Sequence, residues 1–169
     1  MFETADIPIN FAIGIPFDET QVGQWIRLFF ELARHDFRNQ DMLGLFSIPV
    51  CRYWLKAVGV ESEPAAMQSQ LQRLIAEYDL ATHLDAYFDA ARAASKQEDT
   101  RELLILFEAL QTALAPLLRP EAPSYREWGE ALWQFSEALR LLEIFAWNSE
   151  DPYNLNMRAL RHWYAFLKV

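Results

Sequence analysis

The chain begins with a segment in which apolar residues alternate strictly with other residues from position 7 to position 17. The apolar positions are Ile7, Ile9, Phe11, Ile13, Ile15 and Phe17. A period of two is typical of extended chain, because successive side chains then point to opposite faces. The pattern therefore predicts an extended N-terminal arm over residues 7–17 with one continuous apolar face.

After this arm the apolar residues recur every three or four positions, which is the helical period. Asp18 with Gln21 is expected to cap the first helix, and Ser124 with Glu127 is expected to cap the sixth as a capping box. Helices are predicted over about 19–34, 41–58 with a break at Pro49, 63–78, 82–94, 100–118, 124–146, and from just after Pro152 to the end.

Short connections between amphipathic helices favour antiparallel neighbours. The predicted fold class is therefore all-α, a single domain of six to seven mostly antiparallel helices. The extended arm occupies residues 1–17, and the helical domain occupies residues 18–169. A chain of 169 residues is long enough to bury about 68–70% of its unfolded surface in one core.

Two interpretations of the arm stay open. Pro8 and Pro16 remove backbone donors from the same edge of an extended segment, so the opposite edge keeps its amides. In the first interpretation the arm lies in a groove of its own domain, and its apolar side chains complete the core. In the second it pairs with an extended segment of another chain, either a partner or a second copy in a homodimer. Deleting residues 1–17 distinguishes them.

Composition supports a packed core and limits the chemistry. Apolar residues make up 52% and aromatic residues 14% of the chain, well above what a disordered chain carries. Cys51 is the only cysteine, so an internal disulfide and a multi-thiolate zinc site are excluded, and we expect it to be buried. The N-terminus lacks a signal-peptide pattern, and no window of about 18 residues is uncharged and apolar. We expect a cytoplasmic protein without a membrane partner.

The net charge of −9 argues against binding to nucleic acid or to an anionic membrane, since contacts to phosphates dominate such affinity. A partner attracted by this charge would be basic. The charge is uneven, because residues 152–169 contain three basic residues and no acidic one. We expect this C-terminal helix to dock on the acidic remainder, mainly through its apolar residues.

Catalytic motifs are absent from the sequence. There is no glycine-rich phosphate loop and no nucleophile motif. Glu31 with His35, and Asp79 with His83, have the spacing that places two ligands on one helical face, but both pairs lie near predicted helix ends. We expect no metal and no cofactor. A small-molecule-binding protein or a metal-dependent helical enzyme using Asp79 and His83 remains the alternative class.

The sixth predicted helix carries the best candidate for a binding surface, an acidic ridge beside a second apolar stripe. Its residues are Glu127, Glu130, Trp133, Glu137, Ile144 and Trp147. Aromatic anchors beside carboxylates suit a basic protein surface. The sequence therefore predicts a non-enzymatic inhibitor of the immunity or antitoxin type, and an effector chaperone or adaptor is the alternative. A competing interpretation is that these tryptophans simply pack on the C-terminal helix.

Overall fold

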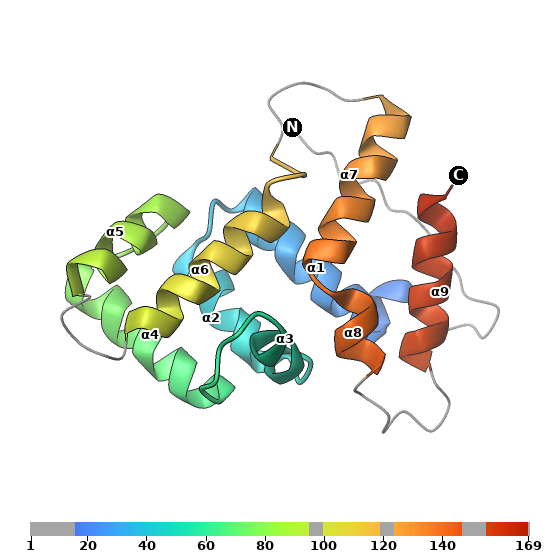
Figure 1. Cartoon of the computed structure of the whole chain (residues 1–169). Helices are drawn as coiled ribbons and strands as arrows, with labels where there is room; N and C mark the ends of the chain where they lie inside the picture. Colours follow the sequence, from blue (N-terminus) through green and yellow to red (C-terminus); the bar gives the residue numbers. More distant parts are fainter. Residues whose placement is uncertain (1–15, 95–99, 119–123, 147–154, 169) are drawn as a thin grey trace.

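Apolar residues at helical spacing form helices along all four stretches described by the computed structural model, residues 16–94, 100–118, 124–146 and 155–168 (Figure 1). Two short 3-10 helices, η1 (Phe17–Glu19) and η2 (Leu45–Ser47), accompany them. The α-helices are α1 (Gln21–Arg34), α2 (Asn39–Gly44), α3 (Cys51–Ala57), α4 (Pro64–Tyr78), α5 (Leu84–Ala94), α6 (Arg101–Leu114), α7 (Tyr125–Ala138), α8 (Leu141–Ala146) and α9 (Leu155–Leu167). These stretches contain no strand, and the predicted all-α fold is confirmed.

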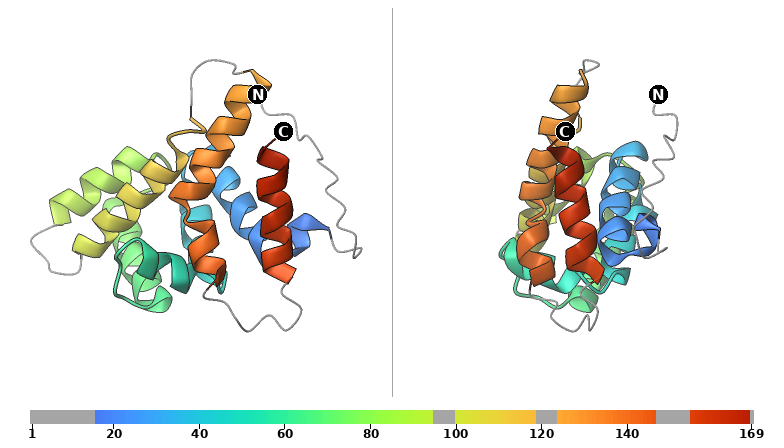
Figure 2. Two further views of the ribbon diagram at one scale, coloured as in Figure 1. Left: turned by 45° about the vertical axis from the view of Figure 1, so that its right-hand side comes forward. Right: turned by 90° about the vertical axis from the view of Figure 1, so that its right-hand side faces the viewer.

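Helix α1 lies between two groups of helices. Helices α2 to α6 form the group on one side, where α5 packs along α6 and α4 contacts both (Figures 1 and 2). On the other side α7 and α9 run antiparallel and in contact, and α8 joins them at the lower end in Figure 1. One continuous cluster of buried residues extends from α1 to α9, as expected of a single domain.

An aromatic group at the centre joins the two sides. Trp25 and Phe29 of α1 both meet Trp54 of α3 edge-on, with ring centroids 5.6 and 5.5 Å apart. Phe29 also lies edge-on to Phe135 of α7 at 6.1 Å. These four side chains are completely buried. Edge-to-face pairs of this kind add about 0.5–1.5 kcal/mol each beyond the burial of their area.

The predicted break of the second helix at Pro49 is confirmed. Helix α2 ends at Gly44, the 3-10 turn η2 follows, and α3 begins only after the proline. A proline inside a helix removes one amide donor and collides with the preceding turn, which explains the interruption. Gly59, predicted to stop this segment, follows α3 with a φ of 90°, in the region that favours glycine.

The predicted cap of the first helix is wrong by two residues. Thr20, not Asp18, is the N-cap of α1, and its hydroxyl accepts the Gly23 amide hydrogen at 3.0 Å. The same hydroxyl donates to the carbonyl of Phe17 at 2.6 Å. Residues 17–19 form η1, and a separate 3-10 turn before the cap cannot be read from the sequence spacing alone.

The long helix predicted over 124–146 is also wrong, because it is two helices. Helix α7 ends at Ala138, and Arg140 has a φ of 53°, which breaks the α-helical path before α8 begins. The break turns the following residues, so that Leu142 is 50% exposed whereas Ile144 is completely buried. Ile144 therefore does not belong to an exposed stripe, contrary to the prediction. Trp147 lies outside the described residues.

Of the arm, the structure describes only the last apolar residue. The ring of Phe17 stacks on that of Trp163 in α9, with centroids 5.7 Å apart and an angle of 8° between the planes. This contact ties the end of the arm to its own domain. Ile7, Ile9, Phe11, Ile13 and Ile15 lie outside the described residues, so both interpretations of the arm stay predictions.

Candidate partner-binding site

The N-terminus of α7 is capped as predicted. The Ser124 hydroxyl accepts the Glu127 amide hydrogen at 3.3 Å, and the Glu127 carboxylate accepts the Ser124 amide hydrogen at 2.7 Å. The same carboxylate oxygen also accepts the Ser124 hydroxyl hydrogen at 2.7 Å. Glu127 is exposed, but its carboxylate has this structural task, so it contributes less to a binding surface than the ridge pattern predicts.

Glu130 and Glu137 are exposed on α7, and each accepts a hydrogen bond from a described side chain. The Arg126 guanidinium donates to Glu130 at 3.2 Å, with Arg126 itself 89% exposed. The Tyr164 hydroxyl donates to Glu137 at 3.0 Å. Exposed ion pairs contribute only about 0–1 kcal/mol, so a partner's cation could replace Arg126 at little cost.

Trp133 lies half-buried between these two glutamates along α7. Its ring meets Tyr164 of α9 edge-on, with centroids 4.9 Å apart. The ammonium nitrogen of Lys168 lies 6.0 Å from the centroid of the Trp133 ring. The competing interpretation, that the tryptophans of this stripe pack on the C-terminal helix, is therefore confirmed for Trp133, although part of its ring remains accessible.

Helix α9 is attached mainly by packing, together with one buried and one partly buried hydrogen bond. The Trp163 indole donates to the Ser136 hydroxyl at 2.8 Å, and the Asn156 amide donates to Gln21 of α1 at 3.4 Å. The pKa of the Tyr164 hydroxyl is raised by burial, by its hydrogen bond to Glu137 and by the charge of that carboxylate. Tyr164 therefore stays protonated and remains a donor.

An open cleft of about 350 Å³ lies between α9 and the pair formed by α7 and α8. Its walls are mostly apolar, and two cationic side chains from α9 line it. The lining residues are Trp133, Leu142, Met157, Leu160, Arg161, Tyr164, Ala165 and Lys168. This wall runs from Met157 in α9 to Lys168, one residue after the helix, a rise of about 16 Å or three helical turns.

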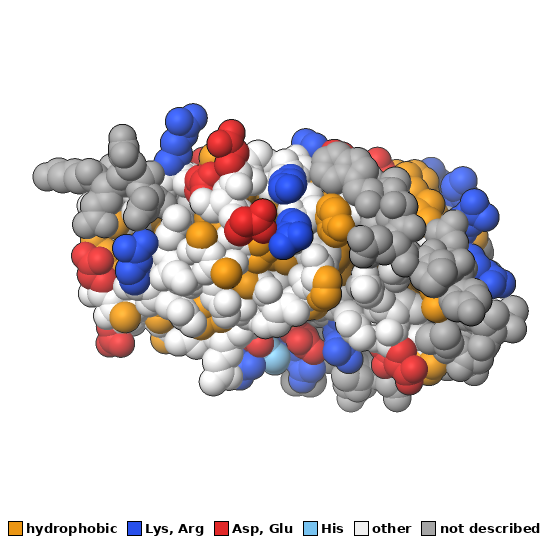
Figure 3. All heavy atoms as spheres, turned by 90° about the horizontal axis from the view of Figure 1, so that it is seen from below, with side chains coloured by type: hydrophobic (Ala, Val, Ile, Leu, Met, Phe, Trp, Pro, Cys, Tyr) orange, Lys and Arg blue, Asp and Glu red, His pale blue; other side chains and the backbone are white. Residues whose placement is uncertain are grey.

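This cleft was not predicted from the sequence, because it depends on the break before α8 and on the direction of α9. One signal was available, since Met157, Arg161, Tyr164 and Lys168 follow a 4-3-4 spacing on one helical face. Figure 3 shows Lys and Arg side chains gathered at the end of the molecule formed by α9, beside hydrophobic side chains. The charge of the cleft wall is thus opposite to that of the ridge on α7.

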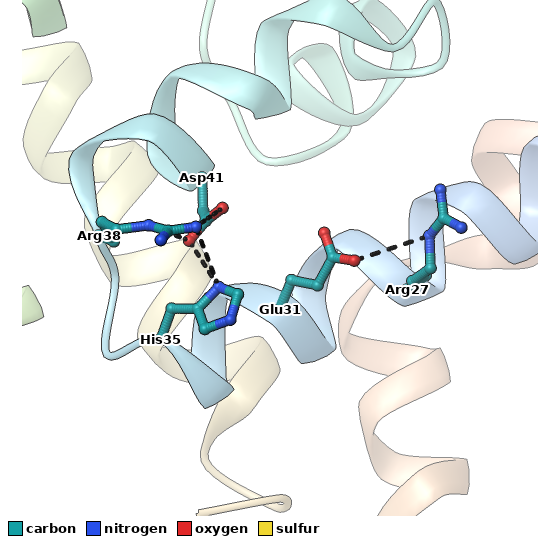
Figure 4. A network of polar contacts seen from close by, with 5 residues as sticks. All are labelled: Arg27, Glu31, His35, Arg38 and Asp41. Atoms are coloured by element: carbon teal, nitrogen blue, oxygen red, sulfur yellow. Dashed lines mark hydrogen bonds and ion pairs between the residues drawn. The ribbon is translucent and has the colours of Figure 1, made fainter. Parts of the chain in front are cut away.

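The two His-carboxylate pairs suggested by the helical spacing do not form. Glu31 pairs with Arg27 at 3.8 Å, and His35 Nδ1 lies 2.9 Å from Asp41, whose carboxylate also accepts from Arg38 at 3.2 Å (Figure 4). Asp41 therefore takes the place predicted for Glu31, because the turn after α1 brings the start of α2 close to His35.

His83 pairs with Asp36 instead of Asp79. The His83 amide also donates to the Asp36 carbonyl at 2.8 Å, and Asn39 donates to Ala81 at 3.0 Å. Asp36, Asp79 and His83 all have positive φ angles, so two turns of unusual backbone conformation are joined here. The described residues contain no group of three or more His, Cys, Asp or Glu side chains placed to hold a metal ion.

Cys51 is completely buried at the start of α3, as predicted. Burial raises the pKa of its thiol to about 12, so the thiolate needed for nucleophilic chemistry is not formed near neutral pH. Tyr87 is also buried, and burial together with the charge of Asp41 raises its pKa to about 12. Both groups are neutral members of the core.

The fold and this face define an all-α protein with an apolar cleft between two antiparallel helices and with carboxylates along one of them. Comparisons with protein-family models, with curated proteins and with solved structures found no match to the chain. In the described part of the chain, each helix is too short or too polar to cross a membrane.

Proposed function

We propose that this protein acts by binding another protein, without catalysis of its own, through the face formed by α7 and α9. The observation that carries the proposal is the position of Trp133. It lies between the exposed Glu130 and Glu137 on α7 and opens onto the apolar cleft. An aromatic side chain next to apolar surface and flanked by carboxylates is suited to a partner that presents basic residues around an apolar contact.

An inhibitor of the immunity or antitoxin type, acting on a basic protein, is the role that these features favour. The net charge of −9 accelerates the approach of a positively charged partner, and carboxylates on a rigid helix can then meet its cations. The buried hydrogen bond between Trp163 and Ser136 keeps α9 against α7, so the surface is already formed before binding. Such preorganisation lowers the entropy that binding must cost.

The cleft favours a second role, that of an adaptor or chaperone that holds a segment of a client protein. Its α9 wall is about three helical turns long, the length of a short amphipathic helix. Leu142 at its edge is 50% exposed and would be covered by such a segment. In this role the apolar wall contributes more to binding than the carboxylates of α7.

The proposal is tested by capturing partners of the tagged protein from native lysate and measuring their affinity for two charge-reversed variants. Glu130→Lys with Glu137→Lys changes the ridge. Glu77→Lys with Glu108→Lys makes the same change in net charge at exposed positions on α4 and α6. We expect the ridge variant to bind at least tenfold more weakly and the control to change affinity less than threefold. Equal losses would leave only a general charge effect, and no partner at all would contradict protein binding.

Leu142→Glu distinguishes the two roles. It places a charge at the edge of the cleft but leaves the carboxylates of α7 in place. An adaptor that holds a client segment in the cleft should lose at least tenfold in affinity. An inhibitor that contacts its partner through the α7 carboxylates should lose less than threefold, and its partner should lose enzymatic or toxic activity when the complex forms.

A further inference from the structure

We propose that the cleft between α9 and the pair formed by α7 and α8 binds a small amphiphile, an apolar chain that ends in a carboxylate. This inference goes beyond protein binding and does not depend on it. It rests on two observations. The cleft walls are mostly apolar, and Arg161, which lines the cleft, has no Asp or Glu partner among the described residues. The cleft volume of about 350 Å³ lies within the usual range of small-molecule sites, roughly 300–1,000 Å³.

The walls provide the apolar part of the site. Trp133, Leu142, Met157 and Leu160 contribute side chains from three helices. Trp133 is half-buried and Leu142 is 50% exposed, so both carry apolar surface that a ligand can remove from water. Burial of such surface contributes about 25 cal/mol per Å². Few polar groups are needed beyond those that orient the ligand.

Arg161 provides the group that would bind the carboxylate. Within the described part of the chain, Arg34, Arg101, Arg158 and Arg161 make no ion pair with Asp or Glu, unlike Arg27, Arg38, Arg52, Arg92, Arg126 and Arg140; of the four, Arg161 alone lines the cleft. Arg161 is also exposed. A guanidinium can donate two parallel hydrogen bonds to a carboxylate, whereas an ammonium group acts as a point charge. Arg161 is therefore better suited to this headgroup than Lys168, the other cation of the cleft.

Arg161 lies near the middle of the wall that α9 contributes, and Lys168 lies at its C-terminal end, one residue after the helix. Lys168 is seven residues from Arg161, about 10 Å further along the helix axis. Its ammonium group is placed over the ring of Trp133 at 6.0 Å. A carboxylate at Arg161 would therefore place the apolar chain along Leu160 and toward Trp133.

The site should also discriminate by charge. Among the residues that the structure describes, the lining includes Arg161 and Lys168 but no Asp or Glu. Glu137 accepts the hydrogen bond of Tyr164, which itself lines the cleft, and Glu143, next to Leu142 in the sequence, pairs with Arg140. A cationic headgroup in the same position would meet like charges, which disfavour binding by an amount similar to the attraction that a carboxylate gains.

The test is a titration of the full-length protein with decanoate and, separately, with decyltrimethylammonium, which has the same chain length and the opposite charge. Nuclear magnetic resonance resolves the indole N–H signals of the six tryptophans, and the Trp133→Phe variant assigns the one at the cleft. We expect decanoate to shift the Trp133 signal in a saturable manner and the cationic amphiphile to bind at least fivefold more weakly. Equal binding of both, or no shift at Trp133, would overturn the proposal.

A pair of variants separates the headgroup contact from a general charge effect. Arg161→Gln should weaken the binding of decanoate at least fivefold. Arg158→Gln removes an exposed cation from the same helix that does not line the cleft, and it should change the affinity less than twofold. Equal effects of the two variants would overturn the assignment of Arg161. Both residues are exposed, so circular dichroism should show unchanged helix content.

Discussion

The indole nitrogen of Trp163 donates a hydrogen bond to the hydroxyl of Ser136 at 2.8 Å, and both residues are buried between α9 and α7. The Ser136 hydroxyl in turn donates to the carbonyl of Leu132 at 2.7 Å. Serine is therefore both donor and acceptor at this point, and it satisfies a buried indole N–H that would otherwise have no partner. The orientation of α9, and with it the wall of the cleft, depends on this contact.

Replacing Ser136 by alanine should destabilise the protein by about 1–3 kcal/mol, because it leaves the buried indole N–H of Trp163 without an acceptor. Urea unfolding followed by circular dichroism measures the change. Ser69→Ala is the matched control, since Ser69 is exposed and also donates to the carbonyl four residues earlier in its helix. We expect the control to change stability by less than about 0.5 kcal/mol. Equal effects would mean that the contact with Trp163 contributes nothing.

Gly23 should not tolerate a side chain. A Cβ atom at this position would lie 2.0 Å from the carbonyl oxygen of Phe17, which belongs to the backbone and cannot turn away. Gly23→Ala should therefore cost about 2–3 kcal/mol in the free energy of unfolding. Gly129→Ala is the control, because its Cβ would meet Leu167 at 3.7 Å, an ordinary contact, within α7. The control should raise stability by about 0.5–1 kcal/mol. The opposite order of the two variants would contradict the close approach of η1 to α1.

Arg140 should accept glycine without loss of stability. Its φ of 53° places a non-glycine residue in the left-handed region, which costs about 1–2 kcal/mol. Arg140→Gly should leave the free energy of unfolding unchanged or raise it by up to about 1 kcal/mol. Arg126→Gly is the control, because Arg126 also forms an exposed ion pair but lies within α7. Arg126 is the second residue of α7, so the control should cost up to about 1 kcal/mol. An equal loss of stability in the two variants would contradict the left-handed conformation of Arg140 between α7 and α8.

The sequence predicted most helices because the apolar period of a helix is long-range and redundant, so a single irregular residue does not hide it. It failed at Arg140 because arginine is common inside helices and nothing in its chemistry announces a left-handed conformation. The apolar residues after Arg140 can be assigned to the core in two ways, one that buries Leu142 and one that buries Ile144. Only the packing of Ile144 into the core, with Leu142 outside, decides between the two.

The thiol of Cys51 should make stability depend on pH in the alkaline range. Burial raises its pKa from 9.0 to about 12. The folded state thus favours the protonated thiol, and the resulting stability is present below pH 9 and is lost as the pH rises from 9 toward 12. At pH 10 this loss is about 1–1.5 kcal/mol. Urea unfolding at pH 7 and pH 10 measures the fall in the free energy of unfolding. This fall should be smaller in Cys51→Ala than in the natural chain, by about 1–1.5 kcal/mol.

A second measurement gives an independent check on the thiol. A thiol-specific colorimetric reagent should not react with Cys51 at neutral pH in the folded protein, and it should react fully in urea above the unfolding midpoint. Rapid reaction in the folded state would contradict its burial. An equal loss of stability for Cys51→Ala and the natural chain would contradict the raised pKa.

The candidate site was predictable only in part. The acidic positions and Trp133 could be assigned to one helix from their spacing, and the capping role of Glu127 follows from a local motif. Sequence spacing does not predict all the residues that contact Glu130, Trp133 and Glu137. Arg126 lies four residues from Glu130, but Tyr164 and Lys168 reach α7 only through the tertiary arrangement of α9. The cleft required three helices to be placed in space, and no local pattern specifies that placement.

The contact between α1 and α9 joins residues that are made at very different times. Gln21 and Asn156 are 135 positions apart, and Phe17 meets Trp163 beside them. At about 5–20 residues per second, a ribosome needs roughly 7–27 s to reach the second partner after the first. Throughout that interval the side of α1 that receives α9 is exposed to other chains. Two copies made on one messenger could then exchange their α9 helices and reproduce the same contacts in a swapped dimer.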